Sequence, residues 1–464
     1  MIEMTRPQIT RSSINVSRPP VRILHLGLGA FHRAHQAWYT SRSEDAAEWG
    51  IVAFSGRSGS IPDLLAPQGG VFTLVERGAE EDRYEHVTSI VDARAAADRA
   101  AYLRYVSAPT TAIITLTVTE AGYSLTPAGM PDLDDPLIVS DIAELQRAIA
   151  SHALNTASPH TTLGRLLLGL EARRRSGAPA IAIVPCDNIP ANGSVLAQAL
   201  AALATLVSPD LASWLPTGAS FVSTSVDRIT PRVTDDLLDA VQNATGWFDA
   251  APVATEPFSD WTLSGEFPAG RPRWESAGAR FVADIAPYES RKLWMLNGAH
   301  TLLAVVGRLR GHRTVAEAMS DDQCLGHVEA WWEETSRHLG EELGVPAYRE
   351  ALLKRFANPR IEHSLSQIAT DSATKLGVRV APVARLERAA GYGAVAAATA
   401  IGAWIASLRL TPQVPDERAD DISLAEQGME PTRDLLAIVA PDLAADEPFS
   451  RSVSDAVDRL TQNP

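Results

Sequence analysis

Residues 21–32 read VRILHLGLGAFH, an apolar run that ends in two closely spaced glycines. The run Val21–Leu26 is typical of a buried strand, and a helical pattern follows Gly29 and continues to about Arg42. Glycines between a strand and a helix let the backbone turn tightly and approach a pyrophosphate, which lies against the helix N-terminus. His32 stands where the usual dinucleotide pattern has a third glycine. A turn that merely joins strand to helix is therefore the alternative reading.

This turn predicts a set of contacts to a nicotinamide cofactor. We expect them from Gly27, Leu28, Gly29, Phe31, His32, Arg33 and Arg57. The acidic residue that usually binds the ribose at the end of the second strand is missing, and Ser55, Gly56 and Arg57 follow that strand instead. An arginine there suits a 2′-phosphate. We therefore expect NAD, with NADP as the alternative.

Strand and helix patterns alternate over the first half of the chain. Further strands are predicted at 49–54, 71–75, 86–91, 112–118, 180–184 and 220–226, and helices at 92–106, 139–153, 161–176 and 191–207. Such alternation predicts an α/β fold with a doubly wound, mostly parallel sheet.

From Tyr288 onward the sequence patterns are helical. The predicted helices span 288–311, 322–341, 347–357, 383–410, 423–439 and 449–461, and the Ala/Gly-rich stretch 391–403 indicates close helix packing. We therefore expect three parts: a loose N-terminal tail at 1–20, a Rossmann-like dinucleotide-binding domain at 21–280, and a mostly helical substrate-binding and catalytic domain at 281–464.

The composition argues against several classes of protein. A net charge of −15 disfavours nucleic-acid and anionic-membrane partners, which require a basic surface. The two cysteines, Cys186 and Cys324, are too few for a disulfide framework and lack the spacing of zinc ligands. Residues 1–20 contain no signal-peptide core, and no run approaches the length of a membrane span. We expect a soluble cytoplasmic protein that binds a small molecule and no metal, and nothing in the sequence demands a dimer.

Lysine is rare in this chain, since only three of its 41 basic residues are lysines: Lys292, Lys354 and Lys375. Arginine does not give up its proton in proteins, whereas a buried lysine can act as a base. Lys292 precedes Asn297 and His300 in an apolar stretch. At about 100° per residue, Asn297 lies about 140° around a helix from Lys292, with His300 between them at about 80°. The alternative is a surface lysine beside polar groups that are satisfied in the core.

Two loops follow predicted strands with polar residues. Asp187 and Asn188 come after the strand at 180–184, and Asn192-Gly193 lie shortly beyond them. Asp227 and Arg228 come after the strand at 220–226. Ligands of open α/β sheets bind outside the carboxyl ends of the strands, so these loops are candidates for a site, although Asn and Gly are also common turn residues.

Several motifs together resemble the mannitol dehydrogenase family of long-chain, polyol-specific dehydrogenases and reductases. They are Gly27-Leu28-Gly29-Ala30-Phe31-His32-Arg33-Ala34-His35, Thr115-Leu116-Thr117-Val118-Thr119-Glu120, Cys186-Asp187-Asn188, and Lys292 with Asn297 and His300. The resemblance implies metal-independent, NAD(P)-dependent interconversion of a polyol or aldonate with a ketose or keto-uronate.

The resemblance also implies roles for individual residues. Lys292 would be the general base, and Asn188 and Asn297 would form the oxyanion pocket. His300 and Asp227 would position the substrate, and Glu289 would gate the route of the proton.

This chain departs from the family pattern near the expected substrate end. Trp294 stands where the family often has Arg, and the usual Asp-Gly-Ser-x-Lys segment reads Asp371-Ser372-Ala373-Thr374-Lys375. We expect Lys375 or Arg379 to hold a sugar carboxylate or a terminal hydroxyl. A phosphosugar or β-hydroxyacid dehydrogenase is one alternative, and a nucleotide-binding sensor with a decayed active site is another.

Overall fold

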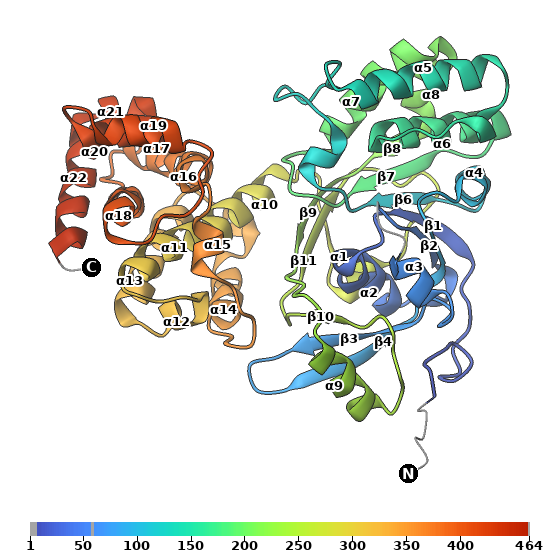
Figure 1. Ribbon diagram of the computed structural model, residues 1–464, viewed down its shortest axis with the longest axis horizontal. Helices are drawn as coiled ribbons and strands as arrows, with labels where there is room; N and C mark the ends of the chain where they lie inside the picture. Colours follow the sequence, from blue (N-terminus) through green and yellow to red (C-terminus); the bar gives the residue numbers. More distant parts are fainter. Residues whose placement is uncertain (1–6, 57–59, 463–464) are drawn as a thin grey trace. The chain divides into compact units, whose positions relative to one another are not determined.

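The protein is described by a computed structural model that covers residues 7–56 and 60–462 (Figure 1). The chain divides into two compact units, the first ending at Ala286 and the second beginning at Pro287. Within the described ranges, no helix combines the length and the apolar character needed to cross a membrane.

The first unit is built on a sheet of six parallel strands in the order β5-β2-β1-β6-β7-β8. Their bounds are β1 Val21–Leu26, β2 Gly50–Phe54, β5 Ile90–Arg94, β6 Ile113–Leu116, β7 Ile181–Pro185 and β8 Ala219–Phe221. This order is that of a Rossmann sheet, so the predicted doubly wound fold is confirmed. The winding reverses between the neighbouring strands β1 and β6.

Both faces of this sheet are buried, as parallel sheets require. Alternate side chains such as Leu24 and Ile114 belong to one core, and Ile23 and Ile113 belong to the other. The first core is completed by α4 Arg99–Val106, α5 Pro136–Ala150, α6 Thr162–Ser176, α7 Asn192–Val207 and α8 Pro209–Gly218. The second is completed by α1 Ala30–Ala34, α2 Gln36–Arg42, α3 Ser60–Leu65 and parts of the small sheets.

Two three-stranded sheets accompany the main one. They contain β3 Phe72–Arg77, β4 Asp82–Val87 and β10 Val253–Thr255 in one, and β9 Ser223–Asp227, β11 Asp260–Ser264 and β12 Arg280–Phe281 in the other. Helix α9, Asp235–Thr245, lies between β9 and β10 in the chain.

Two strands that the sequence predicts as continuous are interrupted in the structure. The strand expected at 220–226 is interrupted at Val222, where β8 leaves the main sheet and β9 begins to pair antiparallel with β11. The strand expected at 86–91 is likewise interrupted after Val87. The helix expected at 92–106 begins only at Arg99, because the Asp98 side chain caps it by accepting a hydrogen bond from Ala101 N at 3.0 Å.

The expected loose tail is wrong for residues 7–20. Ile9 is fully buried, and its amide bonds Phe248 O. The Arg11 guanidinium donates to four carbonyl oxygens, among them Gly69 O at 2.7 Å and Ile90 O at 2.6 Å. Long-range backbone contacts of this kind leave no periodic signal in the sequence.

The second unit is helical, as expected. Its elements are α10 Ala286–Arg291, η5 Lys292–Gly298, α11 Ala299–Leu309, α12 Val315–Met319, α13 Asp322–Ser336, η6 Glu341–Leu343, α14 Val345–Phe356, α15 Leu365–Ala369, α16 Ser372–Arg379, α17 Ala381–Ala389, α18 Val395–Leu410, α19 Ala419–Glu426, α20 Pro431–Val439, α21 Pro441–Ala445 and α22 Glu447–Gln462. The prediction missed α12, α15, α16 and α21, and it joined α19 to α20. It also joined α17 to α18, which are separated by a turn with positive φ at Gly391 (+84°) and Ala394 (+53°).

The core of this unit is organised around α11 and α18, whose side chains are almost all buried. Helix α18 packs closely on α22, since a Cβ at Gly402 would lie 2.7 Å from Ala456 Cβ. The close packing predicted from the Ala/Gly-rich stretch is therefore confirmed.

Candidate active site

The glycine turn lies where the sheet reverses its winding. Gly27 has φ +108°, and a Cβ there would come within 2.3 Å of Thr117 O, so only glycine fits between β1 and the end of β6. The Thr117 hydroxyl donates to Gly27 O at 2.8 Å and holds the turn in place. At Gly29 the nearest atom to an added Cβ is Gly27 O at 3.6 Å, so this side of the turn is open. A pyrophosphate needs such an open backbone at the switch point, and the turn fits a dinucleotide.

Two stacked imidazoles support the turn. His25 Nδ1 lies 2.8 Å from Thr115 Oγ1, and His25 Nε2 lies 3.1 Å from Thr117 Oγ1. The His32 ring stacks on His25 with 3.3 Å between centroids, and both rings are fully buried. Burial lowers the pKa of His25 to about 3 and also lowers the pKa of His32, so both imidazoles are neutral at pH 7.

Burial changes the roles of several residues expected at the cofactor. His32 lies inside the protein, so it supports the turn instead of presenting a surface to the cofactor. The Arg33 guanidinium donates to Ala251 O at 2.5 Å and Gly29 O at 3.2 Å and is 3% exposed, which assigns it to packing. Leu28 is buried as well, whereas Phe31 remains partly exposed. Arg57 lies outside the described residues.

The loop after β7 is held by Asn192. Its side-chain amide donates to Asp187 Oδ1 and to Thr224 O, both at 3.2 Å, and its Oδ1 accepts from Thr224 N at 2.8 Å. Asp187 also accepts from Tyr123 Oη at 2.7 Å. These bonds fix both ends of the loop, and the exposed residue Asn188 lies between them. The motif marked Asn192 in the sequence, but its bonds to β9 could not be foreseen.

Asp227 ends β9 and is partly buried. It does not follow a strand of the main parallel sheet, as the sequence suggested, because β9 belongs to a separate sheet. The neighbouring Arg228 is buried and donates to Ala34 O at 2.7 Å, which ties the end of β9 to α1.

In the second unit, Lys292 and Asn297 lie on a π-helix. Residues Lys292–Gly298 form this element, with α-helix on both sides. Hydrogen bonds of a π-helix join residues five apart, so Lys292 and Asn297 are separated by about one turn. The predicted separation of about 140° assumed α-helical geometry and is wrong. Residues 292–298 are called the π-turn below. Such turns occur frequently at functional sites.

Side chains bind the carbonyl groups of the π-turn. Trp331 Nε1 donates to Trp294 O at 2.8 Å, and Trp332 Nε1 donates to Met295 O at 2.7 Å. The Thr301 hydroxyl donates to Asn297 O at 3.0 Å. Neither tryptophan of α13 was predicted to belong to the site, although two adjacent tryptophans are an unusual feature of a sequence.

His300 is the second residue of α11, which follows the π-turn. Its ring packs 4.5 Å from the ring of Phe356 and 4.7 Å from that of His363. Burial lowers the pKa of His300 well below 6.5, and the neighbouring His363, Arg355 and Arg379 lower it further. His300 is therefore a neutral hydrogen-bonding group beside Asn297.

Comparison with known proteins follows the same division of the chain. Residues 21–276 match the mannitol dehydrogenase Rossmann domain, and residues 284–440 match the mannitol dehydrogenase C-terminal domain. The chain belongs to the mannitol dehydrogenase family. It is 33% identical over 484 residues to D-mannonate oxidoreductase of Escherichia coli strain K12, with 98% of this chain and 96% of that protein covered.

Two solved structures of relatives have the same fold. The substrate-free form of D-sorbitol dehydrogenase matches with a TM-score of 0.87 and 26% identity, covering 98% of both chains. Pseudomonas fluorescens mannitol 2-dehydrogenase, in a ternary complex with NAD and D-mannitol, matches with a TM-score of 0.76 and 30% identity, covering 99% of this chain and 95% of the other.

The two cations expected at the substrate end differ in their surroundings. Lys375 Nζ donates to Ile368 O at 3.0 Å and to Thr370 O at 2.5 Å, so its ammonium binds the backbone at the end of α15. Arg379 Nη1 instead lies 3.1 Å from Thr301 Oγ1 and 3.5 Å from Asn297 O, beside the π-turn. Arg379 is therefore the better candidate for a substrate contact.

The predicted site residues are divided between the two units. Glu289 lies on α10, three residues before Lys292, so the two side chains lie on the same helical face. Lys292, Asn297, His300 and Arg379 come together in the second unit, whereas Asn188 and Asp227 belong to the first.

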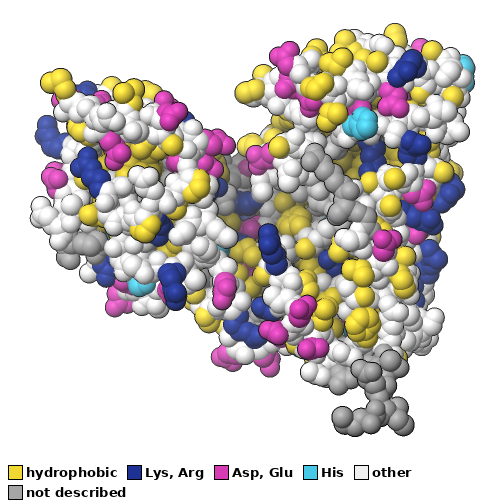
Figure 2. Space-filling model, in the orientation of Figure 1, with side chains coloured by type: hydrophobic (Ala, Val, Ile, Leu, Met, Phe, Trp, Pro, Cys, Tyr) yellow, Lys and Arg dark blue, Asp and Glu magenta, His cyan; other side chains and the backbone are white. Residues whose placement is uncertain are grey.

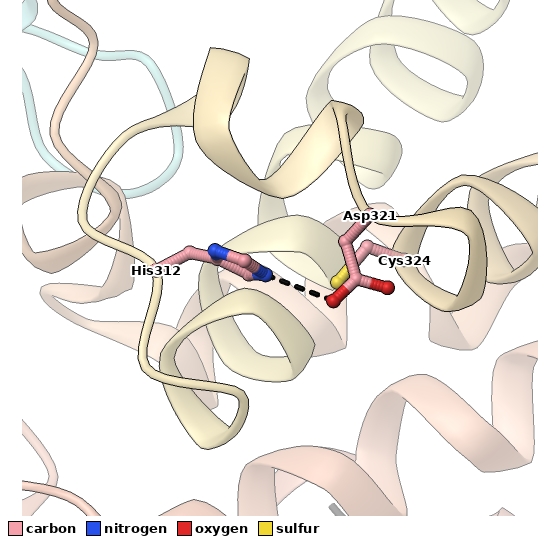
Figure 3. A group of neighbouring side chains, drawn as sticks. All are labelled: His312, Asp321 and Cys324. Carbon is pink, nitrogen blue, oxygen red and sulfur yellow. Dashed lines mark hydrogen bonds and ion pairs between the residues drawn. The ribbon is translucent and has the colours of Figure 1, made fainter.

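One cluster of potential metal ligands lies in the described part of the chain, formed by His312, Asp321 and Cys324 (Figure 3). Asp321 accepts hydrogen bonds from His312 Nε2 at 2.9 Å and Arg310 Nε at 2.6 Å, and it caps α13 through Gln323 N. Burial raises the pKa of the Cys324 thiol to about 12. A guanidinium on the carboxylate and a protonated thiol disfavour a cation, so this cluster serves to join the end of α11 and the loop after it to the start of α13.

Proposed function

We propose that this chain is an NAD(P)-dependent dehydrogenase that interconverts a linear polyol or aldonate, of the mannitol and mannonate class, with the corresponding ketose or keto-uronate. The observation that carries this proposal is the placement of Lys292 and Asn297 one π-helical turn apart, with Arg379 and neutral His300 beside them. Lysine and amide groups at this spacing provide a base and a hydrogen-bond donor for one hydroxyl group. Membership of the mannitol dehydrogenase family supports the same chemistry.

The proposed mechanism gives each side chain one task. Lys292 takes the proton from the hydroxyl that is oxidised, and Glu289 gates the route of that proton. Asn188 and Asn297 donate hydrogen bonds to the developing alkoxide. His300 and Asp227 bind neighbouring hydroxyls. When NAD(P) is bound, its nicotinamide would accept the hydride, and the turn formed by Gly27 and Gly29 would hold its pyrophosphate. No metal takes part in this scheme.

NAD is the favoured cofactor, because the related mannitol 2-dehydrogenase was solved with NAD and D-mannitol. NADP remains the alternative, since the residues after β2 include Arg57 in place of an acidic side chain. The substrate is a small molecule, and we assign the protein to the cytoplasm. A panel of mannitol, arabinitol, sorbitol and mannonate with NAD and NADP, followed at the NAD(P)H absorbance, tests these choices. Turnover of phosphorylated sugars alone, or tight cofactor binding without any turnover, would contradict the proposal.

The role of Lys292 can be tested by the substitution Lys292→Met, which removes the base and keeps an unbranched side chain. We expect kcat to fall by about 10²- to 10⁴-fold, the usual contribution of a general base. The Kd for NADH should stay within about twofold, because removing a base for the substrate leaves the cofactor's own contacts in place. Stopped-flow turnover and NADH fluorescence titration measure the two quantities.

A matched control is available in Lys354→Met. Lys354 is an exposed lysine on α14, paired with Glu350 at 2.6 Å. This variant should keep the kcat of the wild type. Full turnover of Lys292→Met at neutral pH would remove Lys292 from the mechanism.

A further inference from the structure

We propose that Trp331 and Trp332 are positioning residues for the reaction: their indole N–H groups hold residues 292–298 in the π-turn that brings Lys292 and Asn297 to one face. This inference rests on the proposed function, since it assigns a role through the proposed catalytic pair. It concerns contacts within the second unit alone.

The two indoles bind neighbouring carbonyl groups of the π-turn. Trp331 Nε1 reaches Trp294 O at 2.8 Å, and Trp332 Nε1 reaches Met295 O at 2.7 Å. Both tryptophans are fully buried on α13, so each indole N–H requires a partner inside the protein. Two consecutive carbonyls are thus bound by two consecutive side chains, an arrangement that fixes both the position and the rotation of the π-turn.

The backbone of the π-turn explains why these carbonyls accept side-chain donors. In an α-helix Met295 O would accept from the amide of Ala299, four residues later. Here the amide of Ala299 bonds Leu296 O instead. The indole of Trp332 supplies a donor to Met295 O in this stretch. Without the indoles, both carbonyls would lose a hydrogen bond inside the protein, and the preference for the π-turn over an α-helix would weaken.

Gly298 provides independent evidence that the indole of Trp331 and the π-turn fit each other. A Cβ at Gly298 would lie 2.7 Å from Trp331 Cζ2 and 2.8 Å from Trp331 Nε1, closer than real contacts allow. The backbone φ at Gly298 is −62°, which any residue adopts, so glycine is needed here for space alone. The absent side chain makes room for the ring that binds Trp294 O.

A third carbonyl is fixed from another direction. Thr301 Oγ1 donates to Asn297 O at 3.0 Å, and Arg379 Nη1 lies 3.1 Å from the same hydroxyl. The side chains of α13 therefore hold the middle of the π-turn, while Thr301 and Arg379 hold its end. Lys292 lies two residues before the first of these bonded carbonyls, and Asn297 bears the last of them. The relative position of the two side chains therefore depends on these bonds.

The test is a pair of substitutions that remove the donor and keep an aromatic ring, Trp331→Phe and Trp332→Phe. We expect each to lower kcat by about 10- to 100-fold, the loss typical of a small misplacement of reacting groups. The Kd for NADH should stay within about twofold. The acid limb of the pH–kcat profile should also shift, because it reports the general base. Trp404→Phe is the control, since Trp404 is equally buried in this unit but lines a separate pocket with Arg308 and Thr411, and it should keep the kcat and the profile.

Crystal structures of the variants provide a readout that is independent of activity. We expect residues 292–298 to relax toward an α-helix in Trp331→Phe. Unchanged kcat and pH profile in both variants would overturn the inference, and so would a loss of kcat accompanied by an intact π-turn or by equal loss in Trp404→Phe. Failure of Lys292→Met to reduce turnover would refute the proposed function instead, and the two results are distinguishable.

Discussion

At the level of single residues, burial decides the charge of the histidines near the proposed site. His300 is 8% exposed, and its pKa lies well below 6.5 because of burial and of the nearby His363, Arg355 and Arg379. A histidine is neutral at every pH above its pKa, so His300 is neutral at pH 7. In the proposed mechanism it would offer a hydrogen bond to the substrate without exchanging protons in the working range of a dehydrogenase.

This neutrality predicts the pH profile of the variant His300→Gln. Glutamine keeps a hydrogen-bonding group, so we expect KM for the sugar to rise by about tenfold, the value of one lost or weakened hydrogen bond. The acid limb of the kcat profile between pH 5.5 and 10 should stay in place, because His300 is already deprotonated across that range. An acid limb that moves or disappears in the variant would show that His300 itself titrates there. His160→Gln, at a histidine in the first unit, is the control.

The turn between β1 and α1 allows a prediction at the level of the element, because its two glycines have different surroundings. Gly27→Ala places a Cβ 2.3 Å from Thr117 O at φ +108°, so we expect the unfolding free energy to fall by about 2 kcal/mol or more. Gly29 has φ −137° and no close neighbour, so Gly29→Ala should change stability by less than about 0.5 kcal/mol. If a pyrophosphate lies on this open side, Gly29→Ala should nevertheless weaken NADH binding by tenfold or more.

Chemical denaturation and NADH fluorescence titration measure the two effects separately. Gly27→Ala serves as the control for strain, and Gly29→Ala as the test of the site. Wild-type NADH affinity in Gly29→Ala would exclude this turn as the pyrophosphate site.

Some elements of this fold could be predicted from the sequence, and others could not. The order of strands and helices could be predicted because the buried strands of the main sheet carry mostly apolar runs, as in Ile181–Pro185. The change of sheet at Val222 could not, because a strand that leaves one sheet for another keeps its pattern. The π-turn could not be predicted either, since it depends on indoles of a helix more than 30 residues away in the chain. Lys292 and Asn297 could be predicted from their chemistry and Asn188 from the family resemblance, but their geometry required the structure.

At the scale of the whole molecule, the chain is acidic, with a net charge of −15, and acidic and basic side chains are intermingled on the face shown in Figure 2. An overall field of this sign does not favour an anionic substrate, so a sugar acid would need local cations. The second unit provides them around His300, where Arg355 and Arg379 lie close enough to lower its pKa. The ammonium of Lys375 is bound to the carbonyls of Ile368 and Thr370.

This arrangement leads to a prediction that separates sugar acids from neutral polyols. Arg379→Gln should lower kcat/KM for mannonate by about 10- to 100-fold, the value of a hydrogen bond to a charged group, and should lower it much less for mannitol. Arg379→Lys keeps the charge but loses the planar fork, so it should restore part of the activity on mannonate. Lys375→Met is the control, because its loss should affect stability and both substrates alike. Equal losses on mannonate and mannitol in Arg379→Gln would mean that Arg379 acts only through Asn297 O and Thr301, to which it is bonded.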